Sequence, residues 1–167
     1  MLPSPAVGIR RWVSRSVLPL LAAAPGITAQ EPRGMEAGAA AVVLFSQDDF
    51  RGGGLLVAVR PGSGLRLEAG LFPGDRAGPE GTGLRGELTL GYLMAPARPT
   101  GLGLYGRGGV AGESLDGRSG SGWLVLGLGL ESAPGGPSGW FIEAGAGGGF
   151  RLAVGWRRRW LHPRRRS

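Results

Sequence analysis

Residues 83–94 read Gly-Leu-Arg-Gly-Glu-Leu-Thr-Leu-Gly-Tyr-Leu-Met and alternate between two kinds of side chain. Leucines, Gly86 and Tyr92 occupy one set of alternate positions, and Arg85, Glu87, Thr89 and glycine occupy the other. Because successive side chains of a β-strand point to opposite sides, a period of two predicts a strand with one apolar face and one polar face.

Seven further stretches repeat this pattern more or less closely, which predicts eight strands in all. Segments rich in Gly, Pro, Asp and Ser separate them, and each of these residues favours turns for its own physical reason. The predicted strands are 37–46, 52–60, 64–72, 83–94, 101–112, 121–131, 139–147 and 149–161. Eight strands at this spacing, without helical periodicity after residue 30, predict an all-β barrel or sandwich.

The first 29 residues are typical of a secretion signal. Arg10 and Arg11 form a basic region, residues 17–24 form a short apolar core, and residues 27–29 supply small side chains for a signal peptidase. The apolar core is too short for a transmembrane helix, which needs about 20 residues. The alternatives are an uncleaved anchor and a misassigned start codon. The predicted organisation is a signal peptide (1–29), a short N-terminal lead (30–36), a β-barrel (37–161) and a basic C-terminal tail (162–167).

Composition excludes several classes of protein. Glycine accounts for 35 of the 167 residues, but it is interleaved with Leu, Val and Trp, and the hydrophobic fraction of 42% disfavours disorder. The absence of cysteine excludes disulfides, thiolate nucleophiles and cysteine metal sites. The formal net charge of +7 arises from arginines near the two ends of the chain. The body between them is slightly acidic, so it does not offer a basic surface to nucleic acid.

The polar faces of the predicted strands decide between a sandwich and a barrel. They consist mostly of glycine, whereas a soluble sandwich would expose a surface dense in charged side chains. In the reverse sense, Leu, Val and Trp face lipid, and glycine lets the strands close around a narrow lumen. Charges inside that lumen must pair, because an unpaired buried charge is costly. The predicted lumen ion-pair network is Arg66, Glu68, Arg85, Glu87, Arg107, Glu131, Glu143 and Arg151.

This network could line a pore or hold an acidic or zwitterionic ligand, but in a narrow barrel it is better interpreted as a plug of compensating ion pairs. We expect Arg85 and Glu87 to pair with Arg66, Glu68 or Arg107 on neighbouring strands.

With its leader, its strands of roughly 9–13 residues and its aromatic-terminated last strand, the chain resembles the small eight-stranded outer-membrane β-barrels of the OmpA-like class over residues 37–161. The resemblance implies a closed, antiparallel, up-and-down transmembrane barrel in the bacterial outer membrane, with the lipid bilayer as its partner. It also implies a girdle of aromatic side chains at the membrane interfaces. The predicted interfacial aromatics are Phe45, Phe72, Tyr92, Trp123, Trp140, Trp156 and Trp160.

No enzymatic, cofactor or metal site is predicted. The single histidine, His162, lies beyond the last predicted strand, whereas a lipid-modifying hydrolase needs a serine activated by histidine. The glycine runs at 52–54 and 147–149 lack the form of a phosphate-binding loop. The acidic residues at 48–49 and the loop at 116–118 offer too few ligands for calcium.

The run from Arg157 to Arg166 is the sharpest charge feature. In an exported barrel it is expected at the periplasmic rim, beside anionic lipid or cell-wall components. In a cytosolic protein, arginine with interleaved tryptophan would indicate a nucleic-acid binder, but none is expected here. The preferred interpretation is an outer-membrane barrel with a structural or surface-interaction role. The main alternative is a soluble secreted or periplasmic barrel that binds an apolar ligand in a Leu-lined cavity.

Overall fold

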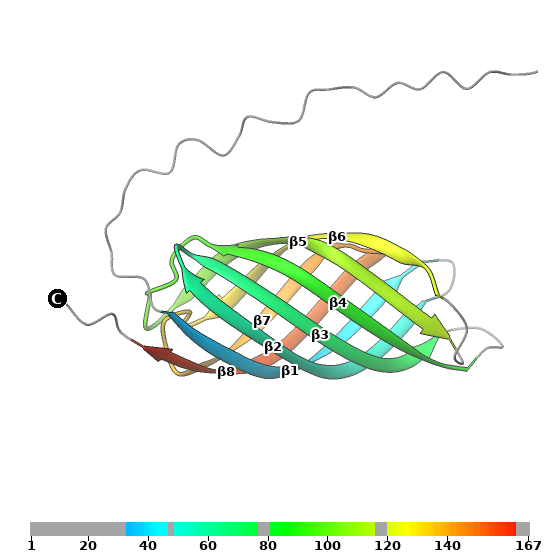
Figure 1. Cartoon of the computed structure of the whole chain (residues 1–167), viewed down its shortest axis with the longest axis horizontal. Coiled ribbons are helices and arrows are strands. Elements are labelled where there is room, and N and C mark those ends of the chain that lie inside the picture. Colours follow the sequence, from blue (N-terminus) through cyan, green and yellow to red (C-terminus); the bar gives the residue numbers. More distant parts are fainter. Residues whose placement is uncertain (1–32, 47–48, 77–80, 116–119, 163–167) are drawn as a thin grey trace, which may run out of the picture.

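Eight antiparallel strands close into a single barrel (Figure 1) in a computed structural model that describes residues 33–46, 49–76, 81–115 and 120–162. Each strand pairs with its neighbours in sequence, and β1 pairs with β8 to close the wall. The strands are β1 (Arg33–Phe45), β2 (Phe50–Gly62), β3 (Leu65–Arg76), β4 (Thr82–Leu93), β5 (Leu102–Leu115), β6 (Gly122–Ser132), β7 (Ser138–Ala146) and β8 (Phe150–His162). The prediction of an all-β, closed, antiparallel up-and-down barrel is therefore confirmed.

The eight predicted strands correspond one to one with the observed strands, but several observed strands are longer. Residues 33–36 of the predicted lead belong to β1, and β8 extends to His162 of the predicted tail. Pro73 and Gly74 form a typical turn signal, yet both pair with β4. The predicted signal peptide and residues 163–167 lie outside the described residues. The described residues include no helix long and apolar enough to cross a membrane.

Side chains alternate between the barrel interior and the outer wall along every strand. In β4, Arg85, Glu87 and Thr89 are buried, whereas Leu84, Leu88 and Leu90 are exposed. This sidedness is the reverse of a water-soluble barrel, in which the leucines would fill the interior. The stretch at residues 83–94 thus keeps its two predicted faces, and the structure assigns the charged one to the inside.

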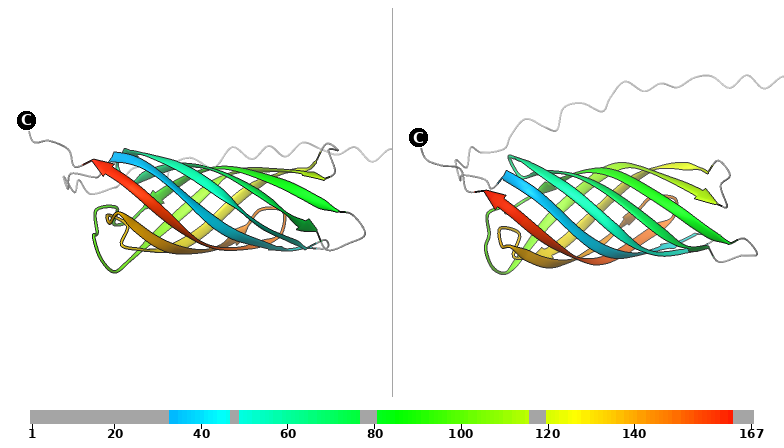
Figure 2. Two further views of the ribbon diagram at one scale, coloured as in Figure 1. Left: turned by 90° about the horizontal axis from the view of Figure 1, so that it is seen from below. Right: turned by 60° about the horizontal axis from the view of Figure 1, so that its bottom comes forward.

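The first strand residue, Arg33, pairs with the last, His162, so the chain enters and leaves the barrel on the same side, which we call the terminus end (Figures 1 and 2). The β2–β3, β4–β5 and β6–β7 turns lie there too. In the β2–β3 turn, Ser63 and Gly64 have φ of 59° and 69°. These positive values fit the short hairpin turn whose twist matches that of the flanking strands.

The rim of the opposite end is uneven. The β6–β7 ladder stops at the pair Leu126–Ala146, whereas the β5–β6 ladder continues to Gly112–Gly122. Strands β3 to β6 consequently extend beyond the β7–β8 hairpin (Figure 2).

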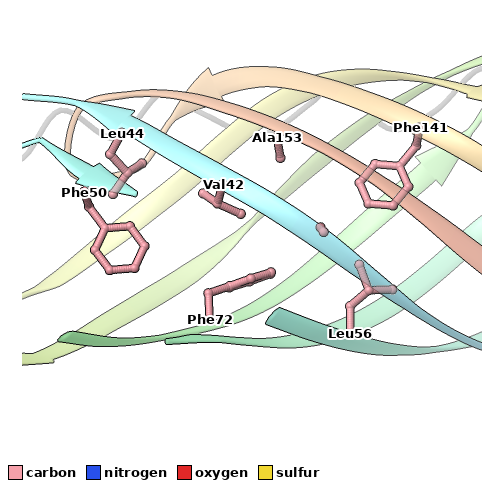
Figure 3. Packing of buried hydrophobic residues seen from close by; sticks show 8 residues of the cluster. Val42, Leu44, Phe50, Leu56, Phe72, Phe141 and Ala153 are labelled. Carbon is pink, nitrogen blue, oxygen red and sulfur yellow. The ribbon is translucent and has the colours of Figure 1, made fainter. Parts of the chain in front are cut away.

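Part of the interior is apolar. Eight inward side chains from β1, β2, β3, β7 and β8 form one cluster (Figure 3). Its members are Ala40, Val42, Leu44, Phe50, Leu56, Phe72, Phe141 and Ala153. We call this set the apolar cluster. It contradicts the prediction that Phe72 is an interfacial aromatic, because Phe72 is 3% exposed. Since β3 extends to Arg76, Phe72 is not at a strand end, and it has the same inward parity as Arg66 and Glu68.

Candidate functional site

A continuous network of ion pairs occupies much of the remaining interior, and every strand contributes to it. All eight residues of the predicted lumen network are buried inside the barrel. The structure adds five buried members to them, namely Glu36, Arg60, Glu113, Arg157 and Arg159. We call these thirteen residues the ionic network. Arg76, which is partly exposed, contacts it through Glu113 at 3.4 Å.

Arg107 lies at the centre of the ionic network. Its guanidinium contacts Glu87 at 2.9 Å, Glu143 at 2.6 Å and Glu68 at 3.4 Å. The hydroxyl of Tyr105 donates a hydrogen bond of 2.6 Å to the other oxygen of Glu143. One arginine of β5 therefore joins carboxylates from β3, β4 and β7 across the interior.

Arg151 and Arg85 extend this centre toward the opposite end. Arg151 donates to Glu87 at 3.1 Å and to Glu143 at 2.7 Å. Arg85 donates to Glu87 at 2.8 Å and to the carbonyl oxygen of Gly147 at 2.8 Å, which ties the β7–β8 turn to the network. The expected pairing of Glu87 with Arg107 is present, but Arg85 pairs with Glu87 of its own strand and with Glu113.

A second group of charges lies toward the terminus end. Glu131 accepts a hydrogen bond of 2.5 Å from Arg66, and Glu36 forms ion pairs with Arg60, Arg66, Arg157 and Arg159. Glu68 joins the two groups, because it contacts Arg157 at 3.0 Å as well as Arg107. The guanidinium of Arg157 also lies 4.0 Å from the centre of the Phe141 ring, where the network meets the apolar cluster.

The five added members show where the sequence interpretation was wrong or incomplete. Glu36 falls in the predicted lead, Arg60 ends a predicted strand and Glu113 falls in a predicted turn. Arg157 and Arg159 belong to the run expected at the periplasmic rim, but both are buried in the barrel. Their positions continue the inward parity of Arg151, which is the signal that could have identified them.

Two arginines of the ionic network form hydrogen bonds with the β6–β7 turn at the terminus end. Arg60 donates to the carbonyl oxygen of Pro134 at 2.8 Å, and Arg159 donates to that of Ala133 at 3.0 Å. The backbone nitrogen of Ala133 in turn donates to Gly101 of the β4–β5 turn at 2.7 Å. The β4–β5 and β6–β7 turns are thus fixed to each other and to the ionic network.

Little free space remains among these side chains. A cavity of about 10 Å³ lies between Arg66, Glu68, Thr89, Gly91, Tyr105, Arg107 and Glu143, about enough for one water molecule. A hollow of about 420 Å³ opens between β1, β2 and β3 near the opposite end, and no leucine lines it. The structure argues against the alternative of a Leu-lined cavity, because most leucines of the described strands face outward.

Inward aromatic rings lie over glycines of the wall. A Cβ atom on Gly155 would come within 2.5 Å of the Phe141 ring on the neighbouring strand, and one on Gly70 would lie 2.6 Å from the Phe72 ring. At Gly129 the obstacle would be the Tyr105 ring. Glycine therefore contributes space for large interior side chains.

The predicted interfacial aromatics separate into two sets. Tyr92, Trp140 and Trp160 face outward toward the terminus end, and Trp156 faces outward from the middle of β8. At the opposite end, Phe45 lies beside Phe150, with ring centroids 6.2 Å apart. Phe72 and Trp123 are the exceptions.

Trp123 has the inward parity of Val125 and Glu131, and its ring lies 5.8 Å from the Arg85 guanidinium. The aromatic set is therefore only partly placed as predicted. Among the described residues, no group of three or more His, Asp or Glu side chains could hold a metal ion.

No protein-family model and no curated protein matches this sequence. Among solved structures, the chain is similar to the N-terminal β-barrel domain of Pseudomonas aeruginosa OprF, with a TM-score of 0.59. The similarity covers 77% of this chain and 99% of that domain at 16% sequence identity. At that level of identity the comparison shows a shared fold, a closed eight-stranded antiparallel barrel.

Proposed function

We propose that this chain is an outer-membrane β-barrel protein with a structural or surface-interaction role and no enzymatic activity. The observation that carries the proposal is the sidedness of the wall. Leu, Val, Ile and aromatic side chains cover the outside, and the interior holds the ionic network.

A hydrocarbon environment accounts for this sidedness. In water, each exposed leucine would forgo a stabilisation of about 25 cal/mol per Å² of apolar surface buried. In lipid the same face is solvated, and a closed barrel leaves no unpaired strand edge. Tilted membrane-spanning strands need about 9–11 residues, and the eight strands contain 9 to 14.

The proposed role does not include conduction. The ionic network, the apolar cluster and the turns over the terminus end together fill the barrel, which supports the interpretation of the charges as a plug. The bilayer is the proposed partner. At the basic C-terminal tail (162–167), anionic lipid or cell-wall components are the proposed contacts and nucleic acid is not.

Insertion tests the proposal directly. The chain without residues 1–29, refolded into phospholipid vesicles, should resist protease and migrate faster in gels before boiling than after it. Cell fractionation should recover it with the outer membrane. A folded, monodisperse protein in detergent-free buffer, or recovery with the periplasm, would contradict the proposal.

A pair of variants makes the test sharper. Leu126→Arg places a charge on the lipid-facing wall within β6, where it should cost about 2–4 kcal/mol and lower the yield of inserted protein. Thr82→Arg adds the same charge at the exposed end of β4 and should insert normally. Equal yields for the two variants would show that the outer wall does not contact hydrocarbon.

In planar bilayers the inserted protein should give no discrete current steps, and such steps would disprove the plugged interior.

A further inference from the structure

Arg158 occupies an unusual position on the outer wall. The other charged side chains that face outward from the described strands are Arg33, Arg51 and Asp75, and each lies within two residues of a strand end. Arg158 lies four residues before the end of β8, with Trp156 and Trp160 on either side of it along the outward face. It is therefore a cation between two outward tryptophans.

The neighbouring strands give this cation a defined surrounding. Ser138 of β7 and Ala37 of β1 lie at the same level as Arg158 in the two ladders. One level further from the terminus end, Trp140 pairs with Trp156. Two small residues therefore flank Arg158 on the outer face, and Trp140, Trp156 and Trp160 lie around it on the same face.

No described residue neutralises Arg158. It forms no ion pair or hydrogen bond within the described part of the chain, and its guanidinium lies 5.9 Å from the centre of the Trp160 ring. The glutamates of the neighbouring strands β1 and β7, Glu36 and Glu143, face the interior. In a bilayer, an arginine at the interface extends toward the headgroups and pairs with an anion. Phosphate is the anion that every phospholipid headgroup offers, and guanidinium binds its oxygens in a bidentate manner.

We propose that Arg158 and Ser138 form a binding site for the phosphate of an anionic phospholipid headgroup. Arg158 binds the phosphate oxygens, and the Ser138 hydroxyl donates a further hydrogen bond from the same level. Trp140, Trp156 and Trp160 pack against the glycerol and the upper acyl chains. Arg33, exposed beyond Trp160, adds positive charge that favours a net anionic lipid over a zwitterionic one. This site rests on the proposed function, since it requires an inserted barrel.

The test compares brominated phosphatidylglycerol with brominated phosphatidylcholine as quenchers of tryptophan fluorescence in mixed vesicles. The wild-type chain without residues 1–29 should prefer phosphatidylglycerol, and this preference should weaken as ionic strength rises. Arg158→Gln should reduce the preference about fivefold, the effect of one arginine near an anionic surface. Ser138→Ala should reduce it by a smaller factor. The matched control is Arg98→Gln, which removes an equal charge from a turn at the same end and should leave the preference unchanged.

The outcomes separate this site from the proposed function. A barrel that inserts, shows the gel shift and is quenched equally by the two lipids overturns the site alone. The site is also overturned if Arg98→Gln reduces the preference for phosphatidylglycerol as much as Arg158→Gln does. It is likewise overturned if millimolar inorganic phosphate abolishes the preference, because that result would show a site for free phosphate. Failure to insert into any vesicle overturns the proposed function and the site with it.

Discussion

The two parts of the barrel interior make different demands on their side chains. In the ionic network, Arg107 satisfies three carboxylates at once, so its removal would leave charges buried without their partner. In the apolar cluster, Phe72 fills space and its loss would leave a cavity. The network joins all eight strands by directional contacts, whereas the cluster packs five strands by shape. The comparison predicts a larger penalty for a lost charge than for a lost ring, and a smaller one for a crowded glycine.

Arg107→Met should lower the stability of the barrel more than any other substitution considered. Removing one partner from a buried ion pair typically costs about 3–5 kcal/mol, and Glu68, Glu87 and Glu143 all lose a contact. Urea unfolding in vesicles would measure the loss. Arg51→Met removes an exposed outward arginine and should change stability by less than about 0.5 kcal/mol. If Arg107→Met does not refold, Arg107→Lys should refold with an intermediate stability. Equal stabilities of the Met variants would contradict a structural network.

Phe72→Ala should have the second-largest effect and lower the free energy of unfolding by about 3 kcal/mol, because removing a large side chain leaves a cavity in a packed interior. Leu71→Ala, one residue earlier on the outer face of β3, should cost less than half as much, since lipid can fill the space it leaves. Thermal shift of the gel-mobility transition would rank the two. A larger effect at Leu71 would mean that the assigned faces of β3 are reversed.

Gly155→Ala should cost about 1–3 kcal/mol, because the new methyl group would crowd the Phe141 ring and the backbone of β1. Gly86→Ala is the control, since no heavy atom lies within 4 Å of the position its Cβ would take. The same unfolding measurement applies to both. A Gly86 variant as unstable as the Gly155 variant would show that the glycines serve backbone geometry and not side-chain space.

These two regions also differ in how far the sequence could predict them. Charges on a glycine-rich face are conspicuous, so eight members of the ionic network could be predicted from alternation in strands such as β4. The β1 members of the apolar cluster could not. Residues 39–45 of β1 are apolar on both faces, so no pattern separates inward Val42 and Leu44 from outward Ala41 and Val43.

The sequence also does not determine which charged side chains pair with each other inside the barrel. Arg66 and Glu131 meet across the interior although 65 residues separate them, because strand tilt and stagger decide which inward side chains share a level. Phe72 and Trp123 are different, since the parity of their own strands places them inside. Their assignment to the interface followed from expected strand ends and not from alternation.

The proposed function requires that the leucine face of the stretch at residues 83–94 contacts hydrocarbon. The chain has no cysteine, so Leu88→Cys can carry a single fluorescent probe within β4, with Leu84→Cys nearer the strand end as its comparison. In vesicles, lipids brominated deep in their acyl chains should quench the Leu88 probe more strongly than the Leu84 probe, and aqueous iodide should barely quench the Leu88 probe. Efficient quenching of the Leu88 probe by iodide, without quenching by brominated lipid, would show that this face of β4 lies in water and not in hydrocarbon.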